Sequence, residues 1–331
     1  MTTLYPWQTT QWQQLQQRRQ SGQLPHALLL HGPEGIGKLD FALAVAESLL
    51  CEHPDENGLA CGQCKACQLI KSTNHPDFIH IHPEETGKAI KIDQIRELIQ
   101  LMSLSAHFSG YRPVLISQAE QMNLAASNSL LKTLEEPQAN TIIILVTSQI
   151  SRLPATIRSR CQMLRFAMPE PLVVKAWLTK QAGAEQTDSL LSAANGAPLL
   201  ARQIADNNML SLRQQILQDL QAVSAGQRQP IIVAAEWYKL TEANPLHWLY
   251  HWLCDMIRLK QGGSRYLASQ DVSNELQSFA ETIDLVKLYQ FLDQVSEAIR
   301  LQQTSANGLL LLEGVLLSWT YLKSDTQRKR A

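Results

Sequence analysis

The feature that most constrains the fold is an apolar run that leads into a glycine-rich loop near the N-terminus. Residues 28–30 are three leucines, and residues 32–38 match the pattern G-x-x-x-x-G-K. The backbone N–H groups of such a loop, the N-terminus of the following helix and a lysine together bind phosphate. We therefore expect a buried strand, a helix over residues 40–50, and between them a phosphate loop whose residual nucleotide-binding residues are Gly32, Gly35, Gly37 and Lys38.

Two positions that hold Mg²⁺ in a working phosphate-loop enzyme carry other residues in this chain. The loop pattern normally ends in Ser or Thr, whose hydroxyl binds Mg²⁺, and here that position is Leu39. A carboxylate normally follows the strand that we predict over residues 114–116, where the chain has Ser117 and Gln118. Glu120 comes too late to replace it and is expected to be a surface or helix-start charge. The Mg²⁺ site is therefore degraded, and ATP binding by the loop is left open.

Four cysteines predict a structural zinc site. Cys51, Cys61, Cys64 and Cys67 have the spacing C-x9-C-x2-C-x2-C. The short spacings let the thiolates converge on one tetrahedral ion and leave no open position for catalysis. The alternatives are a zinc-activated water, a DNA-reading finger and four thiols without metal. Few basic residues flank the cluster, which disfavours the finger.

Three histidines are further candidate metal ligands. His53 could replace one cysteine, but nothing in the spacing favours it. His80 and His82 alternate along a strand predicted over residues 78–82, so they share a face and could form a metal pair. Solvated or hydrogen-bonded histidines are the commoner outcome, and we expect that role for both.

The order of apolar segments predicts an α/β fold followed by helices. Strands and helices alternate up to residue 166, which is typical of a parallel sheet, and the fully apolar run 141–147 suits its centre. Beyond residue 171 only helical periodicity is found. We expect three domains: an α/β domain over residues 1–166 with the cysteine module at 51–67, a small helical domain over 167–208, and a larger helical domain over 209–331.

Bulk composition excludes several classes of function. The 331 residues carry a formal net charge of −1, so no strong global field attracts DNA or an anionic membrane. The N-terminus lacks the basic and then apolar layout of a signal peptide, and no apolar run reaches the roughly 18 residues of a membrane span. We therefore expect a cytoplasmic protein without a membrane partner.

Several motifs together resemble the delta-prime family of clamp-loader subunits of bacterial DNA polymerase III, within the AAA+ superfamily. The resemblance runs from Tyr5-Pro6-Trp7 through the phosphate loop and the four cysteines to His75-Pro76-Asp77. It continues with the sequence LLKTLEEP at residues 130–137, with Ser159-Arg160-Cys161, and with LHWL at residues 246–249. It covers nearly the whole chain, and LLKTLEEP together with Ser-Arg-Cys is specific to clamp-loader subunits.

This resemblance implies a role in DNA replication. The three domains would be an AAA+ domain, a helical lid and a collar that forms a hetero-oligomer. The partners would be the delta and gamma/tau subunits in a five-protein ring, which uses ATP to load the sliding clamp onto primed DNA. The chain would have no intrinsic ATPase activity, and Arg160 would act in trans as an arginine finger in a neighbouring ATP site. A guanidinium can bind two phosphate oxygens and stabilise the charge that develops in phosphoryl transfer.

Two other positions bear on this reading. Arg158 is expected to form a structural ion pair, and Leu199 stands in the segment where active subunits of the family carry a sensor arginine. The competing hypotheses are an independent phosphate-loop enzyme, such as a nucleotide kinase, and a zinc-dependent DNA-binding adaptor. The first needs a hydroxyl and a carboxylate that the sequence does not place, and the near-neutral charge disfavours the second. Direct DNA contacts and the partner-binding surfaces of the collar are left open.

Overall fold

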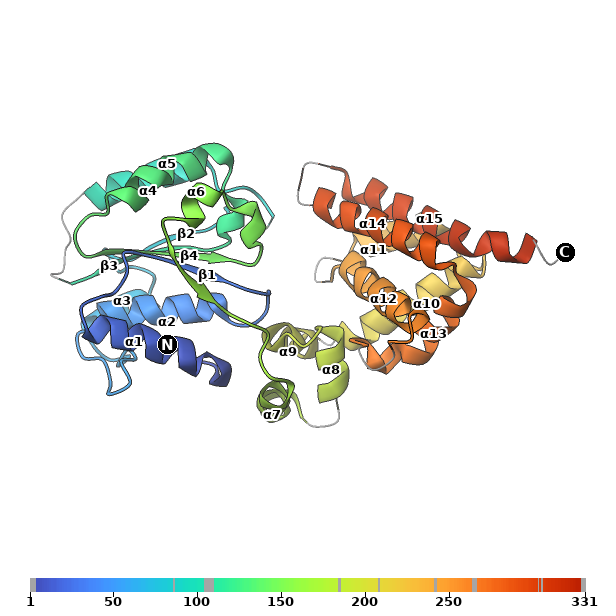
Figure 1. Cartoon of the computed structure of the whole chain (residues 1–331), viewed down its shortest axis with the longest axis horizontal. Helices are drawn as coiled ribbons and strands as arrows, with labels where there is room; N and C mark the ends of the chain where they lie inside the picture. Colours follow the sequence, from blue (N-terminus) through green and yellow to red (C-terminus); the bar gives the residue numbers. More distant parts are fainter. Residues whose placement is uncertain are drawn as a thin grey trace. The chain divides into compact units, whose positions relative to one another are not determined.

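The computed structural model describes residues 4–85, 87–103, 110–183, 186–207, 209–240, 243–263, 267–302, 304 and 306–328, with side chains to residue 322 except at residue 182. It divides into two compact units, residues 1–173 and 174–331. The first unit is an α/β domain, and the described part of the second is helical (Figure 1). This confirms the predicted fold class.

The first unit is built on a five-stranded parallel sheet in the order β2-β3-β4-β1-β5. The central strand β4 pairs with β1 from Ala27↔Ile143 to His31↔Thr147. Its seven residues are all buried, as expected of a fully apolar strand covered on both faces. The strands are β1 (Ala27–His31), β2 (Ile79–Ile81), β3 (Arg112–Ile116), β4 (Thr141–Thr147) and β5 (Gln162–Arg165).

Helices cover both faces of this sheet (Figure 1). Because strand side chains alternate, Leu29 and Ile143 join a core with α4 and α5, whereas Leu28 and Ile144 join one with α1 and α2. The helical segments of this unit are η1 (Pro6–Gln8), α1 (Thr9–Gln20), α2 (Lys38–Leu50), α3 (Lys65–Lys71), α4 (Ile92–Ser103), η2 (Ala119–Gln121), α5 (Leu124–Glu135), η3 (Ile150–Arg152) and α6 (Ala155–Arg158).

The second unit packs its helices around one hydrophobic cluster. Residues of α8 and α9 share this cluster with the aromatic side chains of α12 and α15, including Trp252 and Trp319, which are each 1% exposed. Its helices are α7 (Pro171–Ala182, which begins in the first unit), α8 (Thr187–Ala193), α9 (Pro198–Asp206), α10 (Met209–Ser224), α11 (Pro230–Tyr238), α12 (Pro245–Lys260), η5 (Gln270–Val272), α13 (Ser273–Thr282), α14 (Leu285–Gln302) and α15 (Gly308–Arg328).

The helix and strand boundaries agree with the sequence prediction to within a few residues. The helix expected over residues 40–50 begins earlier, at Lys38, directly on the phosphate loop. The tryptophans of α12 lie in the core, as does most of the LHWL segment, where Leu246 and Leu249 are fully buried. The border between lid and collar at residue 208 stays a prediction. Within the described residues, no helix is long and apolar enough to cross a membrane.

Candidate functional site

The glycines of the phosphate loop are required by its backbone and its close neighbours. Gly32 follows β1 with φ of 151°, and a Cβ there would lie 2.0 Å from the carbonyl oxygen of Phe166. Gly35 and Gly37 have φ of 72° and 83°, which favour glycine. Gly37 then caps α2, whose N-terminus faces the loop. The predicted loop residues are therefore brought together in a phosphate-loop conformation.

An N-terminal segment, η1 with Tyr5 before it, binds backbone carbonyl groups of this loop. Trp7 Nε1 donates to the carbonyl oxygen of Ile36 at 3.0 Å, and Gln8 Nε2 donates to that of Gly37 at 2.7 Å. The Tyr5 ring stacks on Trp7, with centroids 5.1 Å apart. Gln8 is fully buried. Two backbone carbonyl groups of the loop are therefore bound by side chains of this N-terminal segment. The sequence reasoning missed this role, since a glutamine-rich segment carries no signal for it.

The Lys38 ammonium has two oxygen partners within the chain. Its ammonium donates to the carbonyl oxygen of Pro33 and, at 3.1 Å, to the hydroxyl of Ser148, which follows β4. The side chain is 5% exposed. Burial lowers the pKa of Lys38 to about 8, although the carboxylates of Glu120 and Glu34 oppose this shift. The lysine therefore lies where it could meet a phosphate, but it already has partners.

Glu120 lies closer to the loop than the sequence predicted. It is in the first turn of η2, as expected, but its carboxylate is turned inward rather than outward. Oε1 accepts from the backbone N–H of Ser148 at 3.1 Å. Oε2 is buried and has no hydrogen-bond partner among the described residues. The helix-start position predicted for Glu120 is confirmed, and the sequence did not indicate the inward direction of its carboxylate.

The two positions that normally hold Mg²⁺ offer no ligand in this arrangement. Leu39 is 39% exposed and places an alkyl side chain at the position of the usual hydroxyl. The hydroxyl of Ser117 lies 3.0 Å from His80 Nε2, on the neighbouring strand β2. Since β2 is separated from β1 by β3 and β4, this hydroxyl is held on the side of β3 away from the loop.

Arg160 is presented by a short segment between α6 and β5. The flanking residues Ile157 and Cys161 are 0% and 9% exposed, so they fix the backbone of this segment in the sheet core. The Arg160 side chain is 33% exposed. Its Nε and Nη2 both donate to Glu135 Oε1, the former at 2.8 Å, and Nη1 donates to the carbonyl oxygen of Thr156 at 2.9 Å.

Cys161 and Arg158 lie one and two residues from Arg160 in the sequence. Burial raises the pKa of the Cys161 thiol to about 11, so it stays protonated and unreactive near neutral pH. The predicted ion pair of Arg158 is not found among the described residues, and its Nε is buried without a hydrogen-bond partner there. Leu199 lies in the first turn of α9, in the second unit.

The four cysteines form a cluster that could hold a metal ion. All four Sγ atoms lie within 4.8 Å of one another, and those of Cys51 and Cys64 are 4.0 Å apart. A tetrahedral Zn²⁺ with bonds of about 2.3 Å needs sulfur atoms roughly 3.8 Å apart, so the donor set fits. Backbone N–H groups of Gln63 and Cys64 lower the pKa of the Cys61 thiol to about 6, while burial raises the pKa of the Cys67 thiol.

The loop within this cysteine module is tied to α1 and α2. Trp12 Nε1 donates to the carbonyl oxygen of Asn57 at 2.8 Å, and the hydroxyl of Ser48 donates to that of Gly58 at 2.6 Å. Both tethers lie between Cys51 and Cys61 in the sequence. They shape the nine-residue loop that returns the remaining three thiols to Cys51.

His80 and His82 do not form a metal site. Their rings lie 5.2 Å apart, but His80 pairs with Ser117, and His82 Nδ1 lies 2.9 Å from the carbonyl oxygen of Pro83. Burial lowers the pKa of His80 to about 4, so it is neutral at pH 7. In the part of the chain that the structure describes, the cysteine cluster is the one metal-capable group of three or more such side chains.

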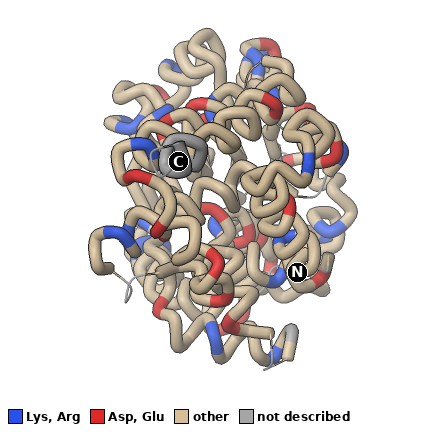
Figure 2. The backbone as a smooth tube through the Cα atoms, turned by 90° about the vertical axis from the view of Figure 1, so that its right-hand side faces the viewer, with Lys and Arg blue, Asp and Glu red and all other residues tan. Residues whose placement is uncertain are grey.

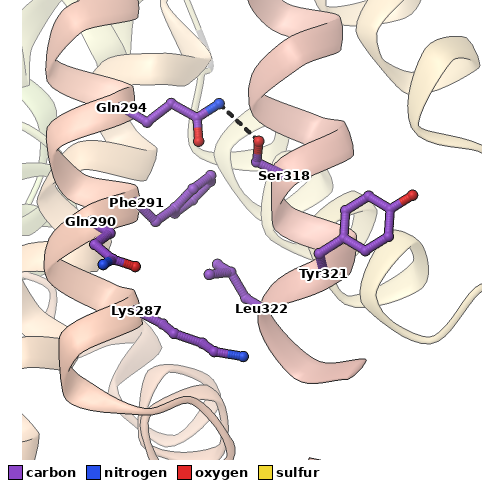
Figure 3. A pocket seen from close by; sticks show the side chains of 7 residues that line it. All are labelled: Lys287, Gln290, Phe291, Gln294, Ser318, Tyr321 and Leu322. Carbon is purple, nitrogen blue, oxygen red and sulfur yellow. Dashed lines mark hydrogen bonds between the residues drawn. The ribbon is translucent and has the colours of Figure 1, made fainter. Parts of the chain in front are cut away.

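A separate hollow of about 410 Å³ lies between α14 and α15 (Figure 3). Gln294 donates to the hydroxyl of Ser318 at 2.8 Å across its upper end. Its lining contains no carboxylate, histidine or cysteine, so it offers no catalytic or metal chemistry. The lining residues are Lys287, Gln290, Phe291, Gln294, Ser318, Tyr321 and Leu322.

The fold and the loop together define the class of protein. A parallel sheet in the order β2-β3-β4-β1-β5, with a phosphate loop after β1, helices on both faces and a helical unit beyond it, is an α/β domain of the AAA+ type. A family model described as DNA polymerase III, delta subunit, matches residues 7–170. A second model, for the C-terminal part of the delta subunit, matches residues 207–321.

Individual relatives narrow this class to one family. The chain is 34% identical over 335 residues to DNA polymerase III subunit delta-prime of Pseudomonas aeruginosa, which covers 97% of this chain and 99% of that protein. It is 31% identical over 326 residues to the delta-prime subunit of Escherichia coli, covering 95% and 94%. The chain therefore belongs to the family of DNA polymerase III delta-prime subunits.

A more distant relative has a different subunit name. The chain is 31% identical over 184 residues to DNA polymerase III subunit tau of Bacillus subtilis, which covers 56% of this chain and 31% of that protein.

Proposed function

We propose that this delta-prime subunit is an ATPase-silent member of a clamp loader and donates Arg160 in trans to an ATP site on a neighbouring subunit. Its partners in this proposal are the delta and gamma/tau subunits and, through the assembled complex, the sliding clamp and primed DNA. The likeness to a subunit named tau supports a ring of related chains. The proposal places the complex in the cytoplasm, where it serves DNA replication.

The observation that carries the silent role is the combination of a formed loop with no metal ligand. Leu39 offers no oxygen, and Ser117 is engaged by His80 on β2. Phosphoryl transfer in phosphate-loop enzymes depends on a metal that bridges the phosphates. The retained glycines and Lys38 support residual nucleotide binding without turnover.

The arginine-finger proposal is supported by the exposure of the Arg160 side chain. The side chain is 33% exposed, although its backbone is fixed by buried neighbours. Arg160→Ala should leave the fold intact and lower ATP turnover of the assembled loader by about the share of one site, because the ATP site that this finger serves loses the guanidinium that stabilises its transition state. ATP turnover is measured on the complex of this chain with the gamma/tau and delta subunits. An unchanged rate in a complex of normal stoichiometry would remove the finger role.

A second candidate function is ATP hydrolysis by this chain alone. One observation favours it: the carboxylate of Glu120 lies beside Ser148 and Lys38, with Oε2 free of hydrogen-bond partners among the described residues. It could orient a water molecule. The missing hydroxyl at Leu39 still argues against a bound Mg²⁺, and we therefore favour the silent role.

We further propose that the ion held by the cysteine cluster is structural Zn²⁺. Four thiolates close the coordination sphere, so the ion would stabilise the module and take no part in catalysis. Cys64→Ser should lower the zinc content from one ion per chain toward none and destabilise the first unit, as measured by metal analysis and thermal unfolding. Cys254→Ser, in α12, is the control and should keep the zinc. Full zinc content in the Cys64 variant would rule the site out.

A further inference from the structure

We infer that Glu135 is a positioning residue for Arg160, a role that rests on the proposed arginine finger and adds a second residue to it. Glu135 is the last residue of α5, within the LLKTLEEP segment. Its Oε1 accepts from both Nε and Nη2 of Arg160, and so it fixes one edge of the guanidinium plane. The carbonyl oxygen of Thr156 fixes Nη1 at 2.9 Å.

These contacts leave the useful donors of the guanidinium available. A guanidinium has five N–H groups, and Glu135 and Thr156 take three of them. Those that remain lie on Nη1 and Nη2, with only a long 3.5 Å approach from Nη1 to the hydroxyl of Ser159. The two terminal nitrogens are the pair that can bind two oxygens of one phosphoryl group. Glu135 therefore orients the arginine without occupying its phosphate-binding end.

The location of Glu135 also points to a role beyond stability. The C-terminus of a helix carries a partial negative charge, so a carboxylate there is unfavourable for the helix itself. The Glu135 side chain is 50% exposed, and an exposed ion pair contributes little to folding. An arginine loses much rotamer freedom when it is fixed, and a carboxylate that fixes it beforehand reduces this loss on engagement with phosphate.

The neighbouring residue supplies a matched control. Glu136 carries the same charge and is also exposed, but it forms no ion pair with the described residues. Replacing either residue with alanine removes one negative charge near the same helix end. Only Glu135→Ala removes the contact to Arg160. A general electrostatic effect would therefore appear in both variants, and a positioning effect in one.

The test measures kcat and KM for ATP hydrolysis by the full chain assembled with the gamma/tau and delta subunits. We expect Glu135→Ala to lower kcat by about half or more of the loss that Arg160→Ala causes, with KM little changed, because orientation matters most in the transition state. Glu136→Ala should retain the original kcat. In the Arg160→Ala background, Glu135→Ala should have no further effect, which a merely structural role would not produce.

Each other outcome contradicts a distinct statement. A normal rate for Arg160→Ala would remove the finger itself, and the positioning role with it. A normal rate for Glu135→Ala beside a reduced rate for Arg160→Ala would overturn only the positioning role. A higher rate for Glu135→Ala would show that Glu135 restrains the arginine instead of presenting it. Equal losses in both backgrounds would assign Glu135 to folding or assembly.

Discussion

Lys38 shows at the residue scale how a phosphate loop can keep its form without a ligand. Its ammonium is buried, yet it has oxygen partners in Pro33 and Ser148 and a carboxylate nearby in Glu120. These groups compensate part of the desolvation that a phosphate would otherwise relieve. The lowered pKa, about 8 instead of 10.5, indicates that the compensation is incomplete. Burial of the charged Lys38 side chain therefore lowers the free energy of unfolding, and titration can measure this effect.

This penalty predicts a pH dependence of stability. Between pH 8 and 10.5 the unfolded chain binds a proton at Lys38 that the folded chain has lost, so the free energy of unfolding rises with pH in that window. The gain due to Lys38 should reach about 2 kcal/mol between pH 7 and pH 9.5. Lys38→Met should remove this gain, and denaturant unfolding at the two pH values measures it. Equal pH responses of the two proteins would contradict the lowered pKa.

Glu120 marks the limit of sequence reasoning at this scale. Its identity and its place at a helix start followed from the sequence, but the direction of its carboxylate did not. The carboxylate contacts the backbone N–H of Ser148, 28 positions away, and a helix-start pattern carries no information on such a contact. By contrast, Leu39 and the four cysteines were found from their spacing alone, because the loop pattern and the thiol chemistry depend on sequence separation.

At the scale of elements, the contact of η1 with the phosphate loop could not be predicted from the sequence. The strands β1 and β4 were predictable, since continuous apolar runs favour buried parallel strands. The three residues of η1 have no such periodicity, and their contacts span 29 positions in the sequence. A contact of this range depends on the assembled sheet. It places Gly37 directly beneath the Tyr5 ring.

The contact of Tyr5 and η1 with the loop predicts that alanine destabilises the protein more at Gly37 than at Gly22. Gly37 has φ of 83°, and a Cβ there would lie 2.6 Å from the Tyr5 ring; Gly22 has φ of 68° and open space around it. Gly37→Ala should lower the free energy of unfolding by about 2–4 kcal/mol, since overpacking adds to backbone strain. Gly22→Ala should cost about 1 kcal/mol from strain alone. Denaturant unfolding of the two variants measures these losses, and similar losses would contradict the close contact of Tyr5 with Gly37.

At the scale of the whole molecule, Asp271 connects helices that the sequence analysis assigned to different domains. Arg213 of α10 is 2% exposed, pairs with Asp271 of η5, and lies 5.2 Å from the Trp252 ring of α12. Asp271 also accepts from Ser192 of α8 at 2.6 Å. Sequence periodicity located these helices but carried no information on which polar groups meet between them. Whether residues 167–208 form a separate lid stays a prediction.

The charge of the whole chain agrees with a protein that acts through protein partners. Lys and Arg positions are interspersed with Asp and Glu positions along the described backbone (Figure 2). The formal net charge is −1. Nucleic-acid affinity that depends on phosphate contacts needs clustered cations. The DNA-binding adaptor considered from the sequence therefore receives no support at this scale, and assembly with related subunits stays the preferred role.

The most direct test of the proposed ATPase-silent role is a measurement of ATP hydrolysis. It uses the purified chain alone and then the chain mixed with the gamma/tau and delta subunits. We predict no Mg²⁺-dependent turnover by the chain alone, because neither Leu39 nor Ser117 offers a ligand to the metal, and turnover in the mixture. Turnover by the chain alone that falls with Lys38→Ala or Glu120→Gln would contradict the account. It would show that Glu120 replaces the missing carboxylate in an active site.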